Sequence, residues 1–485
     1  MKKITIAGLL LLLVLVAAPW GIGQLAESRV NAGLDRLVEQ APYLTISERK
    51  WTRGWFRSEQ QVTFELFAPW TRALGPAATP GDVVVAAPEA VPPAPAAPAE
   101  PIRFTVRNEI LHGPLLWPAG LGIARVNTRL ELDAKTRQKI VEIFGSDDPV
   151  RISTRVSFFG GGTTRLYGDG RTIQLKGGRG SLEYDDYELA VSYSGDLDDI
   201  DLEGSWPELE ILPPEGGSVL VDDVSLVSRN ERILGDLYDT DLRLRVDEVR
   251  VVGPDKSQTL IEGVHYLVDT RADQDFLDVS GKFGSGQVKS KELEELKLDL
   301  DEVHYDFTLR HLHLETLAEM TKAFKQMYAR PMAAVADLDA GMITPLKQYG
   351  AQLLKYDPEF VIDRIGVTTP DGDGYIKGVL RLKGATAEDF QAGSMALIGK
   401  IEADIHIEVA QKLVEKIPSG ATTAGAAVDS GYATRAGEKL VSHIEFKAGQ
   451  LTVNGKVQGI PGIGGPPGAA EGMPPEGEVP PAPQE

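Results

Sequence analysis

The chain has 485 residues, of which 42% are hydrophobic, so it is long enough for several domain-sized units with their own cores. Its 50 Lys and Arg against 71 Asp and Glu give a net charge of −21, and a field of that sign repels phosphate backbones, which argues against nucleic acid as a partner. The absence of cysteine excludes thiol catalysis, cysteine metal sites and lipoprotein acylation.

The N-terminus predicts a membrane anchor. Residues 1–3 carry two lysines, and residues 4–23 carry no charge over a length that crosses about 30 Å of hydrocarbon. The positive-inside rule then keeps residues 1–3 in the cytoplasm and places the bulk of the chain in the periplasm, attached to a Gram-negative inner membrane. A cleaved signal peptide is the alternative, because residues 16–18 are small. Pro19 and the apolar residues after it favour a retained single-pass anchor.

Residues 24–41 predict a juxtamembrane amphipathic helix, because apolar residues recur at three- and four-residue steps until Pro42. This helix packs either on its own domain or on a second copy of the chain, so a homo-oligomer is one of the two alternatives.

A block of aromatic and basic residues stands out in the first β segment, residues 42–74. Short strands are expected at 44–46 and 62–66, on either side of the block. The block suits a contact with lipid headgroups or with the helix at 25–41, and the alternative is that its aromatic rings plug the end of a sheet. The candidate membrane-proximal or partner surface consists of Trp51, Arg53, Trp55, Phe56 and Arg57.

The rest of the chain alternates apolar and polar residues over short segments, as at 242–246, which is typical of half-buried antiparallel strands. The fold class expected is α+β and β-rich: an extended, twisted antiparallel sheet, with helices at about 312–356 covering one face. The segments expected after residue 74 are a disordered Ala/Pro-rich insertion (75–101), a β-rich periplasmic region (102–310), a helical segment (311–357), a C-terminal β-rich region (358–460) and a disordered Pro/Gly tail (461–485).

Histidines and carboxylates give no catalytic, cofactor or metal set. His311 and His313, with His304 before them and Glu315 after, have a spacing that could hold zinc, but partly packed histidines explain the pattern better. His112 precedes a Gly-Pro turn and has no triad partner in the sequence.

For two acidic motifs as well, a turn explains the sequence better than a metal site. The stretch 371–374 resembles the start of a calcium loop, but the twelfth position is Leu382 where a bidentate Glu is needed, so a tight turn is expected. Four aspartates could bind a divalent cation weakly, and a solvated turn is the better interpretation of Asp196, Asp198, Asp199 and Asp201.

Several segments, taken in chain order, resemble the YdgA-like family of bacterial inner-membrane and periplasmic proteins of unknown function. They are Lys2-Lys3, Arg53–Phe56, Leu111–Leu115, Ser205–Pro207, Ile233–Asp236, Leu312–Met320 and Gly449–Lys456. The resemblance implies an inner-membrane anchor with a large periplasmic β-rich domain. It assigns no catalytic residue.

These features together predict a non-enzymatic envelope protein that acts as a scaffold or protein-interaction module, with other envelope proteins or lipids as partners. A lipid- or hydrophobe-binding domain is the first alternative, because alternating strands give a sheet one apolar face. An uncharacterised hydrolase is the second, and it requires His112, or His311 with His313, to meet carboxylates.

Overall fold

The structure is a computed structural model. It describes residues 2–41, 44–66, 102–116, 120–131, 149–175, 178–328, 348–386 and 394–458, with isolated positions between these ranges. The expected insertion (75–101) and tail (461–485) lie outside the described residues, as does most of 329–347. For residues 2–18 only the backbone is described, so most side chains of the predicted span, 4–23, lie outside the description.

The strands are β1 (Leu44–Arg53), β2 (Arg57–Leu66), β3 (Ile102–His112), β4 (Ala124–Glu131), β5 (Arg151–Val156), β6 (Gly162–Gly168), β7 (Arg171–Gln174), β8 (Ser181–Tyr184), β9 (Tyr187–Tyr193), β10 (Asp199–Leu212), β11 (Ser218–Leu234), β12 (Leu237–Val252), β13 (Gln258–Asp273), β14 (Phe276–Ser285), β15 (Val288–Lys289), β16 (Glu302–His313), β17 (Glu359–Thr368), β18 (Gly374–Leu382), β19 (Ile401–Ala410), β20 (Thr434–Ala436), β21 (Lys439–Lys447), β22 (Gln450–Val453) and β23 (Lys456–Gln458). The helical elements are α1 (Lys2–Gln40), α4 (Lys291–Glu295), α5 (Leu314–Tyr328), η1 (Leu354–Tyr356), α8 (Ser394–Ile398), α9 (Gln411–Lys416) and α10 (Gly420–Asp429).

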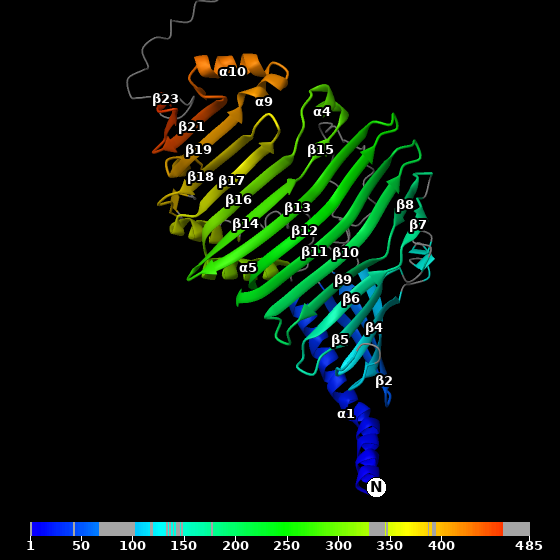
Figure 1. Cartoon of the computed structure of the whole chain (residues 1–485). Coiled ribbons are helices and arrows are strands. Elements are labelled where there is room, and N and C mark those ends of the chain that lie inside the picture. Colours follow the sequence, from blue (N-terminus) through cyan, green and yellow to red (C-terminus); the bar gives the residue numbers. More distant parts are fainter. Residues whose placement is uncertain are drawn as a thin grey trace, which may run out of the picture.

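One antiparallel sheet dominates the molecule (Figure 1), which confirms the expected β-rich class. Its strands pair as a meander in chain order, with three side branches: β8 pairs with β10 beyond β9, β15 pairs with β13, and β20 pairs with β21. Most strands that follow one another in sequence lie side by side, and short turns join many of them, whereas longer segments join β2 to β3, β16 to β17 and β19 to β21.

Three expected strands are longer in the structure than the sequence predicted. The aromatic-basic block forms the inner ends of β1 and β2 and the tight turn between them, so this hairpin is longer than the expected 44–46 and 62–66 segments. The segment 242–246 is the middle of β12, which continues to Val252. The expected helix near 312 begins at Leu314, because His313 still pairs with Phe276 in the sheet.

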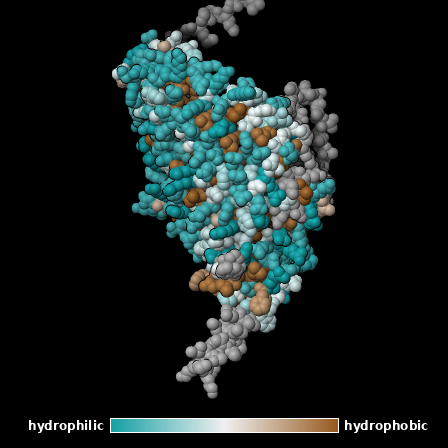
Figure 2. All heavy atoms as spheres, turned by 45° about the vertical axis from the view of Figure 1, so that its right-hand side comes forward, coloured by the Kyte–Doolittle hydropathy of each residue, from teal (hydrophilic) through white to brown (hydrophobic). Residues whose placement is uncertain are grey.

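The sheet has one apolar and one polar face, since successive strand residues point to opposite sides. Cross-strand pairing aligns the apolar side into one line from β5 to β19, here called the apolar row. Its members are Ile152, Leu166, Leu189, Gly204, Leu226, Leu244, Tyr266, Phe283, Tyr305, Ile365, Ile376 and Ile407. A parallel line two residues away contains Val191, Leu202, Leu242, Val268, Phe307, Ile362, Ile405 and Ile444. Figure 2 shows a face of the molecule that is mainly hydrophilic.

Helix α1 packs on the first strands, and a buried hydrophobic cluster lies at this contact. Ala26 is fully buried together with Ile110 and Ile123, and the same cluster contains Ala124, Val126 and Val156. Gly23 permits the close approach, because a Cβ there would lie 2.6 Å from the His112 Cε1 atom. Among the described residues, no helix combines the length and the hydropathy that a membrane span requires.

A buried chain of hydrogen bonds fixes how α1 sits on the sheet. The Gln60 amide donates to Asn31 of α1 at 2.9 Å, and the Asn108 amide donates to Gln60 at 2.8 Å. Thr128 then donates to Asn108 at 2.8 Å. Because each buried amide has its partner in place, any rotation or sliding of α1 would leave polar groups unpaired in the core.

Candidate functional site

Exposed apolar side chains gather on three loops at one end of the sheet. In a meander, every second turn lies at the same end of the strands. This brings together the β1–β2 turn, the β3–β4 loop and the β5–β6 turn. The exposed fractions range from 42% for Phe158 to 93% for Phe159. We call this group the apolar tip, and it consists of Trp55, Phe56, Leu115, Leu121, Phe158 and Phe159. Figure 2 shows hydrophobic side chains at the lower end of the molecule.

Helix α1 leaves the sheet at the same end, and Figure 1 shows it extending beyond the strands. Arg53, in the β1–β2 hairpin, pairs with Glu27 of α1, and Gly23 lies against His112 beside the β3–β4 loop. The apolar tip therefore surrounds the point from which the N-terminal part of α1 projects.

The structure separates the five residues of the sequence-based surface. Trp55 and Phe56 belong to the apolar tip, at 50% and 57% exposed. Trp51 instead packs against the buried cluster under α1. The two arginines are held by carboxylates, Arg53 by Glu27 and Arg57 by Glu109 at 2.6 Å. Sequence reasoning missed Phe158 and Phe159, although an aromatic pair before three consecutive glycines is itself a sign of an exposed turn.

A basic hollow lies on the polar face next to the apolar tip. Arg125 and Arg155 are direct cross-strand partners on β4 and β5, and Arg165 lies on the neighbouring β6. With Tyr167 and Glu188 they line a space of about 530 Å³. The Gly120 backbone of the β3–β4 loop is near Arg155, which joins the hollow to the tip. Guanidinium groups beside exposed aromatic rings are the chemistry that receives phosphate headgroups.

His112 is buried and bonded on both ring nitrogens. Its Nδ1 lies 3.2 Å from the Trp55 carbonyl oxygen, which can only accept, so Nδ1 carries the proton. Its Nε2 then accepts from the Ser58 hydroxyl at 2.9 Å. A hydrolytic triad needs a carboxylate on the second nitrogen, and at His112 that place is taken by a backbone carbonyl.

Replacing His112 by Phe is expected to lower the free energy of unfolding by about 1–3 kcal/mol, because the Ser58 hydroxyl would stay buried without a partner. Adding Ser58→Ala should recover part of the loss, since it removes the orphaned hydroxyl. Urea unfolding of the parent chain, His112→Phe and the double variant measures both effects. A double variant that is less stable than His112→Phe by a full second increment would contradict this pairing.

The zinc set considered from the sequence is not assembled. The His313 Nδ1 lies 3.0 Å from the Thr316 hydroxyl, and its ring stacks on Tyr356 with 4.0 Å between centroids. His304 pairs with Glu302 at 3.0 Å. Within the described part of the chain, His311 and His313 belong to no cluster of three potential ligands.

The acidic stretch 371–374 is neutralised by cations of the chain itself. Asp371 pairs with Lys416, and Asp373 pairs with Arg364 at 3.3 Å. Between them Gly372 has φ +114, the conformation that a tight turn requires of glycine.

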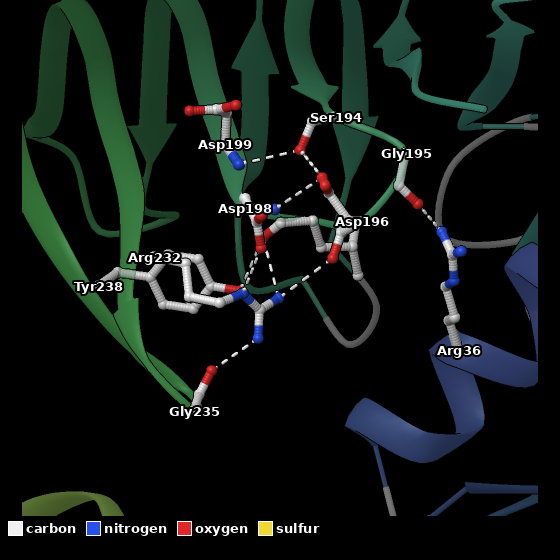
Figure 3. Close-up of polar contacts among 10 residues, drawn as sticks. Arg36, Ser194, Gly195, Asp196, Asp198, Asp199, Arg232, Gly235 and Tyr238 are labelled. Carbon is white, nitrogen blue, oxygen red and sulfur yellow. Dashed lines mark hydrogen bonds and ion pairs between the residues drawn. The ribbon is translucent and has the colours of Figure 1, made fainter. Parts of the chain in front are cut away.

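The other acidic motif is the turn between β9 and β10, which is bonded to α1 on one side and to β11 on the other (Figure 3). The Arg232 guanidinium lies 3.0 Å from an Asp198 carboxylate oxygen and donates to the Leu197 carbonyl at 3.0 Å. Hydrogen bonds from the Ser194 hydroxyl and the Asp198 backbone N–H hold the pKa of the Asp196 carboxyl below its usual value. Arg36 of α1 donates to the Gly195 carbonyl, so the turn connects the helix to the sheet.

The chain belongs to the family described as bacterial protein of unknown function (DUF945), whose model matches residues 1–458. Neither a curated protein nor a solved structure matches it.

Proposed function

We propose that this protein is a lipid-binding envelope protein, held at a bacterial inner membrane by α1, whose apolar row receives acyl chains. The observation that carries the proposal is the exposure of aromatic rings in the middle of the row. Tyr266, Phe283 and Tyr305 are neighbours on β13, β14 and β16, and they are 40%, 48% and 47% exposed. Aromatic rings that are aligned on a sheet face and half exposed form a surface to which an apolar ligand would bind favourably.

The shape of the apolar face favours methylene chains over a protein partner. The row runs from β5 to β19, which is roughly 50 Å at about 4.8 Å per strand. The second line lies about 7 Å beside it. Protein interfaces combine apolar contacts with hydrogen bonds and a polar rim, whereas most members of these lines are aliphatic or aromatic and their polar atoms are hydroxyls, such as those of Tyr266, Tyr305 and Ser228. A methylene chain needs no hydrogen bonds and gains about 0.8 kcal/mol for each buried CH₂.

The apolar face also contains a tyrosine in a poorly solvated position, Tyr193 on β9. Burial raises the pKa of the Tyr193 phenol, although a hydrogen bond with Thr164 partly offsets the effect. Tyr193 pairs with Ile200 on β10 and with Gly162 on β6. A low-polarity surface that starts close to the tip gives acyl chains a path from the membrane to the centre of the sheet.

The tip supplies the contact with the membrane in this proposal. Trp55 suits the interfacial layer, and the Phe and Leu side chains of the tip suit the boundary between headgroups and acyl chains. The arginines of the basic hollow give a local positive charge in a chain whose net charge is −21, so headgroups meet this end more favourably than the rest of the surface. The finer YdgA-like grouping, an inner-membrane anchor with a periplasmic domain, fits the same arrangement.

Photo-crosslinking tests the proposal and separates it from the scaffold role. The full chain is reconstituted in vesicles of phosphatidylethanolamine and phosphatidylglycerol that contain a lipid with a diazirine on its acyl chain. After irradiation, labelled peptides are mapped by mass spectrometry. Label in β12–β17 is expected. Label confined to α1 and the tip would contradict the lipid-binding role. In that case, in-cell cross-linking of the apolar row to another protein would favour the scaffold role.

Orientation at the membrane gives a separate prediction. Because the chain has no cysteine, a single Phe159→Cys variant can carry one nitroxide label. In the same vesicles, this label is expected to be accessible to lipid-soluble oxygen and protected from an aqueous nickel chelate. The matched control is Glu215→Cys, in the exposed turn between β10 and β11 at the opposite end of the sheet. Equal exposure of the two labels to the nickel chelate would contradict the docking of the tip.

A further inference from the structure

Two neighbouring strands near the C-terminus place an aspartate and two histidines on one surface. Asp404 and His406 are two residues apart on β19, so they point to the same side. His443 lies on β21, directly opposite His406 in the ladder. The connection between these strands includes α9, α10 and β20, and for this reason His443 is far from Asp404 and His406 in the sequence.

The three side chains converge on one point. The Nε2 atoms of His406 and His443 lie 3.1 Å and 3.0 Å from the same Asp404 carboxylate oxygen, Oδ1. One ligand atom from each residue lies within 4.8 Å of the other two. In a tetrahedral zinc site with bonds of about 2.0–2.2 Å, neighbouring ligand atoms are about 3.3 Å apart. The two observed nitrogen–oxygen separations are close to that edge length.

We propose that Asp404, His406 and His443 bind a divalent transition-metal ion of the zinc class. Two imidazole nitrogens and one carboxylate oxygen suit zinc, and they do not suit calcium or magnesium, which prefer oxygen ligands throughout. Three protein ligands leave one position of a tetrahedral site for a water molecule. This site lies outside the apolar row and the apolar tip, and it stands independently of the lipid-binding role.

The site is accessible and requires only a small rearrangement. The side chains of His406 and Asp404 are each 57% exposed and that of His443 is 35% exposed, so an ion reaches them without any opening of the fold. The imidazole rings are stacked, with 4.1 Å between centroids and 8° between planes. Rotation about the terminal side-chain torsions, which are soft, would turn both Nε2 lone pairs toward one ion.

The backbone around the ligands is held in place before any ion binds. The Asn454 side-chain oxygen accepts from the His443 N–H at 2.9 Å, and the Asn454 N–H donates to the His443 carbonyl at 2.8 Å. The ladder between β19 and β21 continues on both sides of the His406–His443 pair. A bound ion would therefore join two strands whose relative position is already set, and it would stabilise the C-terminal part of the sheet.

The test is Co²⁺ titration of the full chain, purified without a histidine tag and followed by visible absorbance, with Zn²⁺ competition by calorimetry. One equivalent is expected, with the absorption of a four-coordinate site that Zn²⁺ displaces. His443→Ala and His406→Ala should each weaken binding at least tenfold. His304→Ala is the matched control, because His304 has the same kind of carboxylate contact, with Glu302, but belongs to no cluster of three potential ligands in the described part of the chain.

Two outcomes would overturn the proposal: no binding of either ion at stoichiometric protein, or binding that His443→Ala leaves unchanged. Far-ultraviolet circular dichroism of each variant confirms that the sheet is intact. A structural role alone for the histidines would change the melting temperature without any cobalt absorption in the parent protein, and this result would also count against the site.

Discussion

Replacing Phe283 by Glu is expected to reduce acyl-chain cross-linking in β12–β17 at least about tenfold, because a carboxylate placed against methylene groups loses its hydration without gaining a partner. Phe283 lies in the middle of the apolar row, between Tyr266 and Tyr305, and its ring lies 6.2 Å from that of Tyr305. The same photoactivatable lipid and peptide mapping measure the change. Since the Phe283 side chain is half exposed, the variant should still fold.

The neighbouring residue provides the control. Lys282 precedes Phe283 on β14 and points to the opposite, polar face, where it lines a charged hollow with Asp278 and Arg310. Lys282→Glu introduces the same side chain one position away, and its change of charge is larger than that of Phe283→Glu. It should leave the cross-linking unchanged. An equal loss in both variants would mean that overall charge governs the labelling, and the apolar face would then have no role in it.

Replacing Ile110 by Ala is expected to lower the free energy of unfolding by about 2–5 kcal/mol, because it leaves a cavity in the core where α1 meets the sheet. Ile110 is fully buried and packs with Ala26 of α1 and Val126 of β4. Urea unfolding of the reconstituted chain, followed by tryptophan fluorescence, measures the loss. The buried amide chain through Gln60 lies on the same contact, so the variant should also weaken the docking of α1.

Ile211→Ala is the matched control for this change. Ile211 lies on β10 and is 39% exposed, so the same truncation should cost less than about 1 kcal/mol. Similar small losses for the two variants would show that α1 is not part of the cooperative core. Helix α1 and the sheet would then be stable independently of their contact.

Side-chain alternation was enough to predict the β-rich sheet, but it misplaced strand ends wherever the alternation changes phase. In β12 the apolar residues change from even positions, ending at Val246, to odd positions, beginning at Val249. The pairing with β11 continues through this change. Asp223 on β11 has φ +47 and Gly263 on β13 has φ +63, and such residues re-aim a pleated strand as bulges do. In the sequence alone, such a change of phase looks like the end of a strand.

The candidate site was predictable only in part, for a related reason. Trp55 and Phe56 stand out in the sequence, yet the same block contains Trp51, which packs in the core. The signs of exposure and of burial are identical in the sequence, because Trp51 and Trp55 are both aromatic residues two positions from Arg53. Only the position of the β1–β2 turn decides which ring lies at the tip and which faces α1.

The sequence by itself determined the local properties of this protein: an antiparallel sheet with one apolar face, a long N-terminal helix, and an acidic surface without thiol chemistry. These follow from the order of residues along single strands and helices. The tertiary structure alone decided which distant residues meet. Cross-strand register aligns Tyr266, Phe283 and Tyr305 into one row and brings His443 to Asp404, because pairing between strands depends on turns and on the whole sheet, which no single segment encodes.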